Sequence, residues 1–499
     1  MFLKRISGAG RRFASRMVLM GCLVLGQGAA LAPVASAEGL DGLFSIFEPS
    51  DEASIGKQQH PRILAQYGGE YVQEGLNEYI LDVGLRLAFA TGRTDISWQF
   101  TILNSPVVNA FALPGGYVYI SRGLLALANN EAEIAGVLAH EIGHVIARHG
   151  AQRQSRATGL GLLGALAGIL TQNADVFRMG QTVGGLYLAG YSRDQEFEAD
   201  QLGVKYLGLA GYPREAMAGF LKRMQAHAEF QSRLAGNGGQ SQFDFFATHP
   251  QTDDRIARAE QLAAREADAL ERHYGQAEFM TKLDGILYGD DIKEGVIRSR
   301  WFLHPDLRLK FRAPKGFQLI NSQRAVYAVN GKGYQMVFDL DPGGLKGLSV
   351  SDYLRRVWMR EQNLRYVDDI QVGGAQAART ELVLQQNGKR IFVTAVAINF
   401  GYDKVARFVY TGPDLNAELR KLYRGSYNSF QPMTYDEAMA IKPVHLDLRF
   451  VENERSVEQL VKSMADLQNR KALFILLNPE FDGKDPEPGD PYKLPVYGR

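Results

Sequence analysis

Cysteine is almost absent from this sequence, and its one cysteine, Cys22, lies in an N-terminal stretch that has the pattern of a secretory signal. Residues 1–37 start with basic and no acidic side chains, continue as an apolar run and end in an A-x-A cleavage site. Without them the chain has no thiol, so thiol catalysis and a disulfide framework are excluded. Two alternatives to a signal peptide cleaved after residue 37 are a retained membrane anchor and a lipoprotein signal at Cys22.

The sequence also has no excess of basic charge and no second long apolar run. Its formal net charge is +1, and this becomes −4 once residues 1–37 and their five basic side chains are removed. That balance excludes the electrostatic pattern of a nucleic-acid-binding protein. Beyond residue 37 no run is long and apolar enough to span a bilayer. We therefore expect an exported chain with two or three domains, each stabilised by its own core.

What the sequence does contain is the motif H-E-x-x-H at residues 140–144. On a helix, His140 and His144 share one face, so both imidazoles can reach one metal ion. Glu141 between them then points toward the open side of that metal. The context favours a helix, because Asn130 is a good N-cap, Glu133 suits a capping box, and Gly150 is placed for a C-terminal stop.

Two histidines leave a catalytic zinc one ligand short, because such a site takes three protein ligands and one water. His149 is a poor candidate for the third, since five residues beyond His144 a helix has turned by about 140°. We interpret it as a residue near the negative end of the helix dipole. Gly150 excludes the longer motif that would need a third histidine at that position.

A better third ligand lies about fifty residues downstream, in a segment with helical pattern. Glu196 and Asp200 are four residues apart and face one way, whereas Glu198 points nearly opposite. We assign Glu196 as the third metal ligand and Asp200 as the carboxylate that orients a ligand histidine. The alternative is an ordinary charged face of a helix.

These motifs, in this order, resemble the M-48 family of zinc metallopeptidases over about residues 55–275. The matching features include T-H-P at 248–250, R-I at 255–256 and the run N-A-F-A-L-P-G-G-Y-V-Y at 109–119. Within the family, the sequence is most similar to periplasmic proteases of the BepA type. The resemblance implies one zinc ion per chain, with Glu141 as the catalytic base and three ligands, His140, His144 and Glu196.

The same resemblance gives roles to three further parts of the sequence. In BepA-type proteases the histidine of T-H-P approaches the zinc and restrains activity, which here implies His249, with Arg255 as a nearby polar partner. His249 could instead donate to the oxyanion. An edge strand beside the motif helix would pair with an extended substrate, and our candidate begins with four residues, Asn109, Ala110, Phe111 and Ala112. An ordinary core strand is the alternative.

We expect an α+β protein with several parts in order along the chain. They are a signal peptide (1–37), a leader (38–60), a mainly helical zincin-type metalloprotease domain (61–275), a linker (276–300), an α+β accessory domain on an antiparallel sheet (301–435) and a small βααβ module (440–499). The uncharged, glycine-rich residues 158–170 suit a mobile lid, a membrane-contacting surface or a buried helix. The last module resembles a divergent LysM domain, which implies contact with peptidoglycan.

The expected function is therefore that of a periplasmic zinc-dependent endopeptidase. Its substrates would be unfolded or misassembled envelope proteins, and its partners an outer-membrane protein or the membrane surface, with no nucleic acid. The alternative is an envelope assembly or quality-control factor, chaperone-like or anchored to peptidoglycan, with little proteolysis. The BepA type carries helical repeats after its catalytic domain, and this sequence has none, so a chaperone-like role of such repeats is not implied.

Overall fold

The computed structural model describes residues 49–150, 190–235, 245, 249–250, 253–265, 273–322, 325–386, 389–401 and 404–498. The chain divides into residues 1–46, which lie outside this set, and residues 47–499, to which the description below refers. The predicted signal peptide, the glycine-rich segment 158–170 and Thr248 are also outside the described residues.

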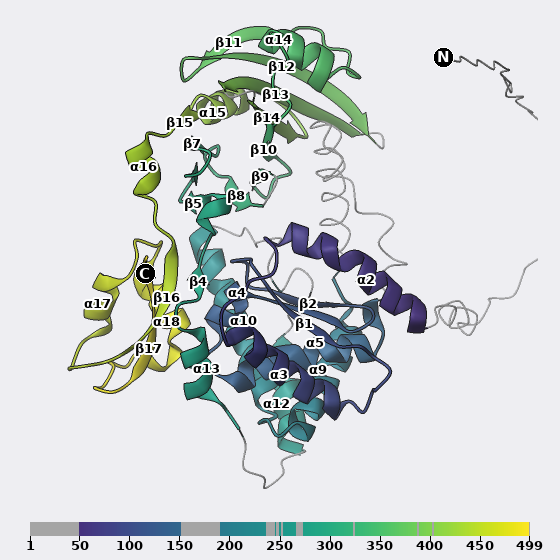
Figure 1. The fold of residues 1–499 in the computed structure, drawn as a ribbon, viewed down its shortest axis with the longest axis vertical. Helices are drawn as coiled ribbons and strands as arrows, with labels where there is room; N and C mark the ends of the chain where they lie inside the picture. The colour runs from purple at the N-terminus through teal and green to yellow at the C-terminus, as the bar shows by residue number, and fades with distance from the viewer. Residues whose placement is uncertain are drawn as a thin grey trace, which may run out of the picture. The chain divides into compact units, whose positions relative to one another are not determined.

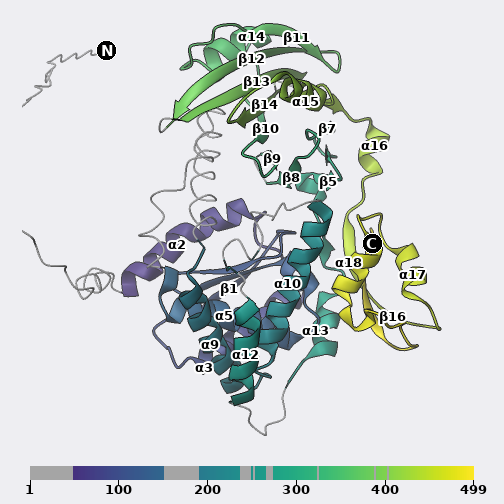
Figure 2. The ribbon, with the colours of Figure 1, turned by 180° about the vertical axis from the view of Figure 1, so that it is seen from behind.

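The part that contains the H-E-x-x-H motif combines a small sheet with helices (Figures 1 and 2). Its strands are β1 (Gln99–Leu103), β2 (Ala110–Leu113) and β3 (Tyr117–Ser121). They lie in the order β1-β3-β2, with β3 parallel to β1 and antiparallel to β2. Its helices are α2 (Pro49–Gln66), α3 (Leu76–Ala90), α4 (Arg122–Leu127), α5 (Glu131–Ile146), α9 (Arg193–Leu209), α10 (Ala216–Ala235), α12 (Asp253–Arg265) and α13 (Gln276–Leu283).

The two faces of this sheet are covered by different helices. Val118 and Ile120 of β3 point into the main core with α5, while Tyr117 and Tyr119 pack with residues of α2. This alternation follows from the period of two along a strand. Helix α2 begins at Pro49, so residues 49–60 of the predicted leader 38–60 are helical.

The motif helix α5 begins as the sequence predicts and ends earlier. The Asn130 side chain accepts a hydrogen bond from the backbone N–H of Glu133 at 2.8 Å, as an N-cap does. The Glu133 carboxylate bonds the N–H of Asn129 rather than that of Asn130, so the predicted capping box does not form. The helix ends at Ile146, and Arg148 adopts a left-handed conformation with φ of 56°, before the stop predicted at Gly150.

Residues 296–432 form antiparallel sheets with helices, as the sequence predicts. A seven-stranded sheet has the order β11-β12-β13-β14-β10-β9-β8, and a four-stranded one has the order β15-β7-β6-β5. Their strands are β5 (Val296–Arg298), β6 (Trp301–His304), β7 (Leu309–Arg312), β8 (Gln318–Asn321), β9 (Val326–Val329), β10 (Gln335–Asp341), β11 (Asp368–Val372), β12 (Ala375–Gln386), β13 (Lys389–Gly401), β14 (Lys404–Gly412) and β15 (Gln431–Pro432). Residues of α15 (Ala417–Tyr427) and α14 (Val350–Tyr353) belong to the two separate apolar clusters of the larger sheet.

The C-terminal residues have the predicted strand–helix–helix–strand order. The elements are β16 (Val444–Phe450), α17 (Val457–Leu460), α18 (Arg470–Leu477) and β17 (Pro491–Tyr497), with β16 and β17 antiparallel. They do not form a separate core, because their buried side chains belong to the same apolar cluster as those of α5. The predicted linker 276–300 is folded too, since it contains α13 and strand β4 (Leu287–Tyr288), which pairs with β16.

A buried lysine strengthens this connection between the C-terminal elements and the motif helix. Lys493 of β17 donates hydrogen bonds from Nζ to three carbonyl oxygens at the end of α4, those of Ala126, Leu127 and Ala128, at 2.8–3.1 Å. These carbonyls are the ones that a helix end leaves without partners. Burial lowers the pKa of Lys493. The C-terminal strand thus provides hydrogen-bond donors for the carbonyl oxygens at the end of α4, just before α5 begins.

The architecture confirms the predicted α+β class, with helices and antiparallel sheets in successive parts of the chain. Among the described residues, no helix is long and apolar enough to cross a membrane.

The shared core leads to a prediction about stability. Replacing the fully buried Phe474 of α18 with Ala should lower the free energy of unfolding by about 3–5 kcal/mol, because a ring-sized cavity opens in the core. The amide hydrogens of α5 should then exchange faster, as measured by mass spectrometry. Phe450→Ala, at a side chain of the same module that is 59% exposed, is the control and should change little. Unchanged exchange in α5 would mean that the module folds independently.

Candidate metal centre

Two helices bring the predicted metal ligands together. Helix α5 carries His140 and His144, and α9 packs along it with Glu196 (Figure 1). Gly143 makes the approach possible, since a Cβ atom there would lie 2.9 Å from the carbonyl oxygen of Ala199 on α9. The residues of the two motifs are therefore within reach of one ion, although more than fifty positions separate the first from Glu196.

Four buried donor atoms converge at this point. His140 Nε2 lies 3.1 Å from His144 Nε2 and 3.1 Å from His249 Nδ1. Glu196 Oε1 lies 3.1 Å from His249 Nδ1 and 3.4 Å from His144 Nε2. All four side chains are buried from solvent. His140, His144, Glu196 and His249 therefore form one compact group of nitrogen and oxygen donors.

The donor set fits a zinc ion. Zinc binds imidazole nitrogen at about 2.0–2.1 Å in a tetrahedral arrangement, which places neighbouring donors about 3.3 Å apart. Four of the donor pairs are separated by 3.1–3.4 Å, around that value, and all four donor atoms lie within 4.8 Å of one another. Three imidazoles and a carboxylate are also a donor set that zinc accepts.

The position of His249 in this group bears on the two roles that the sequence left open for it. If His249 Nδ1 served as a fourth ligand, a zinc ion bound here would have no position left for water. The other ring nitrogen, Nε2, lies 3.4 Å from Oε1 of Glu141, which is itself fully buried. The ring stacks on Phe245 with centroids 4.3 Å apart. This arrangement favours the role of a fourth ligand, which stays a prediction.

A buried arginine and a second carboxylate support the donors. Asp200 Oδ1 lies 2.9 Å from His140 Nδ1, as the spacing of Glu196 and Asp200 predicts. Arg255 contacts both acids, with Nε 2.7 Å from Asp200 Oδ2 and Nη1 2.6 Å from Glu196 Oε2. Two buried negative charges are thus paired with one buried guanidinium.

The electrostatics follow from burial and from these pairs. Burial alone would raise the pKa of Glu196, but the charges of His249 and Arg255 outweigh it and hold that pKa well below its ordinary value. Burial disfavours a charged His140, yet the hydrogen bond and the charge of Asp200 raise its pKa overall. The pKa of His144 is well below its ordinary value, chiefly because of burial. Glu196 is therefore an ionised ligand and His144 a neutral one.

Two residues of the site were not found from the sequence. His149 is buried beside the metal donors, with Nδ1 at 2.9 Å from His144 Nδ1 and Nε2 at 3.2 Å from Glu198 Oε2. His149 is not among the four donors, but its contact with His144 was not predicted, and neither was the contact of the exposed Glu198 with His149. Tyr191 stacks on the His144 ring, with centroids 3.8 Å apart. No sequence signal marks Tyr191, and His149 was missed because a continuing helix was assumed.

The predicted substrate strand lies next to a cleft that His144, one of the metal donors, helps to line. Among the described strands β2 pairs only with β3, so no described strand pairs with its other edge. The cleft beside it is lined by Ala112, Leu113, Pro114, His144, Val145, Arg148, Gly150 and Tyr191. Asn109 precedes the strand and is buried, with its N–H donating to Ser121 Oγ at 3.1 Å. Phe111 faces α2 and stacks on Tyr119.

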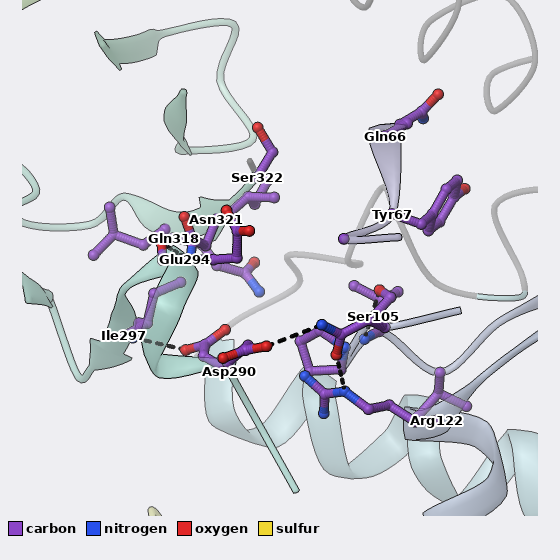
Figure 3. Close-up of a pocket in the computed structure, with 18 of the residues that line it drawn as sticks. Gln66, Tyr67, Ser105, Arg122, Asp290, Glu294, Ile297, Gln318, Asn321 and Ser322 are labelled. Carbon is purple, nitrogen blue, oxygen red and sulfur yellow. Dashed lines mark hydrogen bonds between the residues drawn. The ribbon is translucent and has the colours of Figure 1, made fainter. Parts of the chain in front are cut away.

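A second cavity of about 250 Å³ is separate from the metal donors (Figure 3). Its walls include Asn104, Arg122, Asp290 and Asn321, and none of the four donor residues lines it. Arg122 is fully buried and donates from Nε to Asn104 Oδ1 at 2.8 Å. The chemistry that the motifs predict therefore belongs to the centre on α5 and α9, not to this cavity.

Comparison with known proteins agrees with this placement. Residues 74–263 match the model described as Peptidase family M48, a range that includes all four donors. A putative beta-barrel assembly-enhancing protease of Vibrio cholerae is 32% identical over 225 residues, 42% of this chain and 45% of that protein. The beta-barrel assembly-enhancing protease of Escherichia coli is 31% identical over 197 residues, 38% of this chain and 39% of that protein. The mitochondrial metalloendopeptidase OMA1 of Schizosaccharomyces pombe is 28% identical over 212 residues, 42% of this chain and 60% of that protein.

These matches cover less than two thirds of the length of each relative. The matched family range ends before the antiparallel sheets and the C-terminal strands begin.

Proposed function

Because residues 74–263 match the model of peptidase family M48, we propose that the protein is an exported zinc-dependent endopeptidase of the periplasm. Its substrates are peptide bonds of unfolded or misassembled envelope proteins. The observation that carries the proposal is the convergence of His140, His144, Glu196 and His249 on one point, with Glu141 beside them. The names of the relatives, which are proteases and metalloendopeptidases, support the same reaction class.

Different residues of the chain have different roles in hydrolysis. His140, His144 and Glu196 hold the ion, and when bound, zinc supplies Lewis-acid activation of water and of the scissile carbonyl. Glu141 accepts a proton from the attacking water and delivers it to the leaving amine. Asp200 fixes the ring of His140 through its Nδ1.

The edge of β2 with which no described strand pairs favours an extended substrate. A peptide that adds a strand to a sheet edge gains backbone hydrogen bonds without a required sequence. The edge lies beside the cleft that His144 and Tyr191 line, so such a peptide passes close to the metal donors. Only a chain segment without its own secondary structure can pair in this way, which supports unfolded or misassembled proteins as substrates.

His249 gives this enzyme a restrained state. As a fourth donor it occupies the position that a catalytic zinc keeps for water, and hydrolysis then requires its departure. Restraint suits a protease that is exported among proteins it must not degrade. The alternative function, an envelope assembly or quality-control factor with little proteolysis, is favoured by the same four-donor arrangement.

The direct test is the metal content and the activity of purified residues 38–499. We expect one zinc ion per chain and cleavage of unfolded casein. A chelator should abolish this cleavage, and added zinc should restore it. Zinc measured by plasma emission spectrometry, with the cleavage followed on gels, gives both readouts. A chain that binds no zinc would overturn the proposal, whereas one zinc without cleavage would favour the assembly factor.

Contact with peptidoglycan through residues 440–499 has less support. The apolar side chains of this part are buried in the core that contains α5, and Lys493 is bonded to α4. Its residues thus support the metalloprotease part structurally, whatever else they contact.

A further inference from the structure

A chain of three side chains connects the metal centre with the surface. His144 Nδ1 lies 2.9 Å from His149 Nδ1, and His149 Nε2 lies 3.2 Å from Glu198 Oε2. His149 is 1% exposed, whereas the Glu198 side chain is 59% exposed. The fold therefore places a buried imidazole between a metal donor and a surface carboxylate.

The protons in this chain have one consistent arrangement once the metal is bound. His144 offers Nε2 to the metal, because that atom faces the other donors, so its proton is on Nδ1. His149 Nδ1 then accepts this proton's hydrogen bond, and the neutral His149 ring carries its own proton on Nε2. That proton points to the Glu198 carboxylate, which can only accept.

The backbone is shaped to bring His149 into this position. On a continuing helix His149 would lie about 140° around from His144. Helix α5 instead ends at Ile146, and the left-handed Arg148, with φ of 56°, turns the chain back toward the metal face. A left-handed conformation in a residue other than glycine is uncommon and costs free energy.

We propose that His149 is a positioning residue of the metal centre, which holds His144 as an Nε2 ligand, and that Glu198 holds His149. The inference rests on the proposed zinc centre. The two ligand histidines of α5 are then held differently. His140 contacts a buried carboxylate directly, whereas His144 reaches a surface carboxylate through His149. Solvent screens the charge of Glu198, so the contact between His149 and Glu198 contributes less to holding His144 than the contact between His144 and His149.

The test compares variants that remove different members of this series of three contacting side chains. His149→Leu removes both hydrogen bonds at similar volume, and should weaken zinc binding by about 10- to 100-fold, the usual effect of losing such a partner. His149→Asn keeps an acceptor near the Nδ1 position and should recover part of that loss. Glu198→Ala should weaken zinc binding only a few-fold. Affinities are measured by competition with a chromophoric chelator.

A second readout reports the tautomer itself. With ¹⁵N-labelled histidine and zinc bound, the His144 Nδ1–H resonance should move or exchange faster in His149→Leu and remain in His149→Asn. Asp194→Ala is the control. It removes an exposed carboxylate of α9, the helix that also carries Glu198, but Asp194 does not take part in these contacts, so neither measurement should change.

The outcomes separate this inference from the proposed function. A wild-type chain without zinc affinity would overturn the metal centre itself. Tight zinc in wild type together with unchanged affinity and unchanged His144 signals in His149→Leu would overturn only the role of His149. If His149→Leu does not fold, as judged by thermal melting, unchanged zinc affinities in both His149→Asn and Glu198→Ala would overturn it equally.

Discussion

Replacing Glu141 with Gln is expected to lower the rate of peptide hydrolysis by about 10²–10⁴-fold, the usual contribution of a general base. The amide has the shape of the carboxylate but cannot accept the proton of the attacking water. Glu141 is not one of the four donors, so zinc should stay at one ion per chain. The rate is measured with a fluorogenic peptide, and the zinc by emission spectrometry.

This substitution also separates the two proposed functions. A factor that only binds unfolded proteins should keep its full binding and its cellular role in Glu141→Gln, while a protease should lose the role with the activity. Glu133→Gln makes the same chemical change at the start of the same helix, away from the donors, and serves as the control. Equal cleavage by Glu141→Gln and by wild type would contradict the assignment of the base.

Replacing His249 with Ala is expected to raise hydrolysis by about tenfold or more. If the fourth donor occupies the water position in at least about 90% of molecules, its removal makes the whole population competent. Three donors remain, so zinc should still be bound. The measurement is initial cleavage rate per bound zinc, which corrects for any loss of metal.

Other outcomes for His249→Ala are equally informative. A fall by about 10²–10³-fold would assign His249 as a donor to the oxyanion instead. An unchanged rate per zinc would contradict both roles. His273→Ala, at an imidazole whose side chain is 53% exposed and outside the donor group, is the control and should behave like wild type.

Much of the site could be predicted because its information is local in the sequence. The spacing of four between His140 and His144, and between Glu196 and Asp200, places each pair on one helix face whatever the rest of the fold does. Alternation of apolar residues likewise predicted an antiparallel sheet within residues 301–435, which the structure has. Local periodicity is a direct consequence of backbone geometry, so it needs no knowledge of distant contacts.

The tertiary structure decided the features that depend on how distant segments meet. The resemblance implied that His249 approaches the metal, but its distances to His140 and Glu196 depend on contacts between parts of the chain that are far apart in sequence. Arg255 pairs with Glu196 and Asp200 for the same reason. The left-handed turn at Arg148 brings in His149, against the expectation from helical spacing.

The C-terminal part shows the same division. The sequence by itself determined its strand–helix–helix–strand order, which the structure has. Only the tertiary structure decided that this part shares its core with α5, with Lys493 bonding the end of α4 and Phe474 buried in the common cluster. An apolar periodicity states which face of an element is buried, but the partner of that face is chosen by the packing of the whole chain.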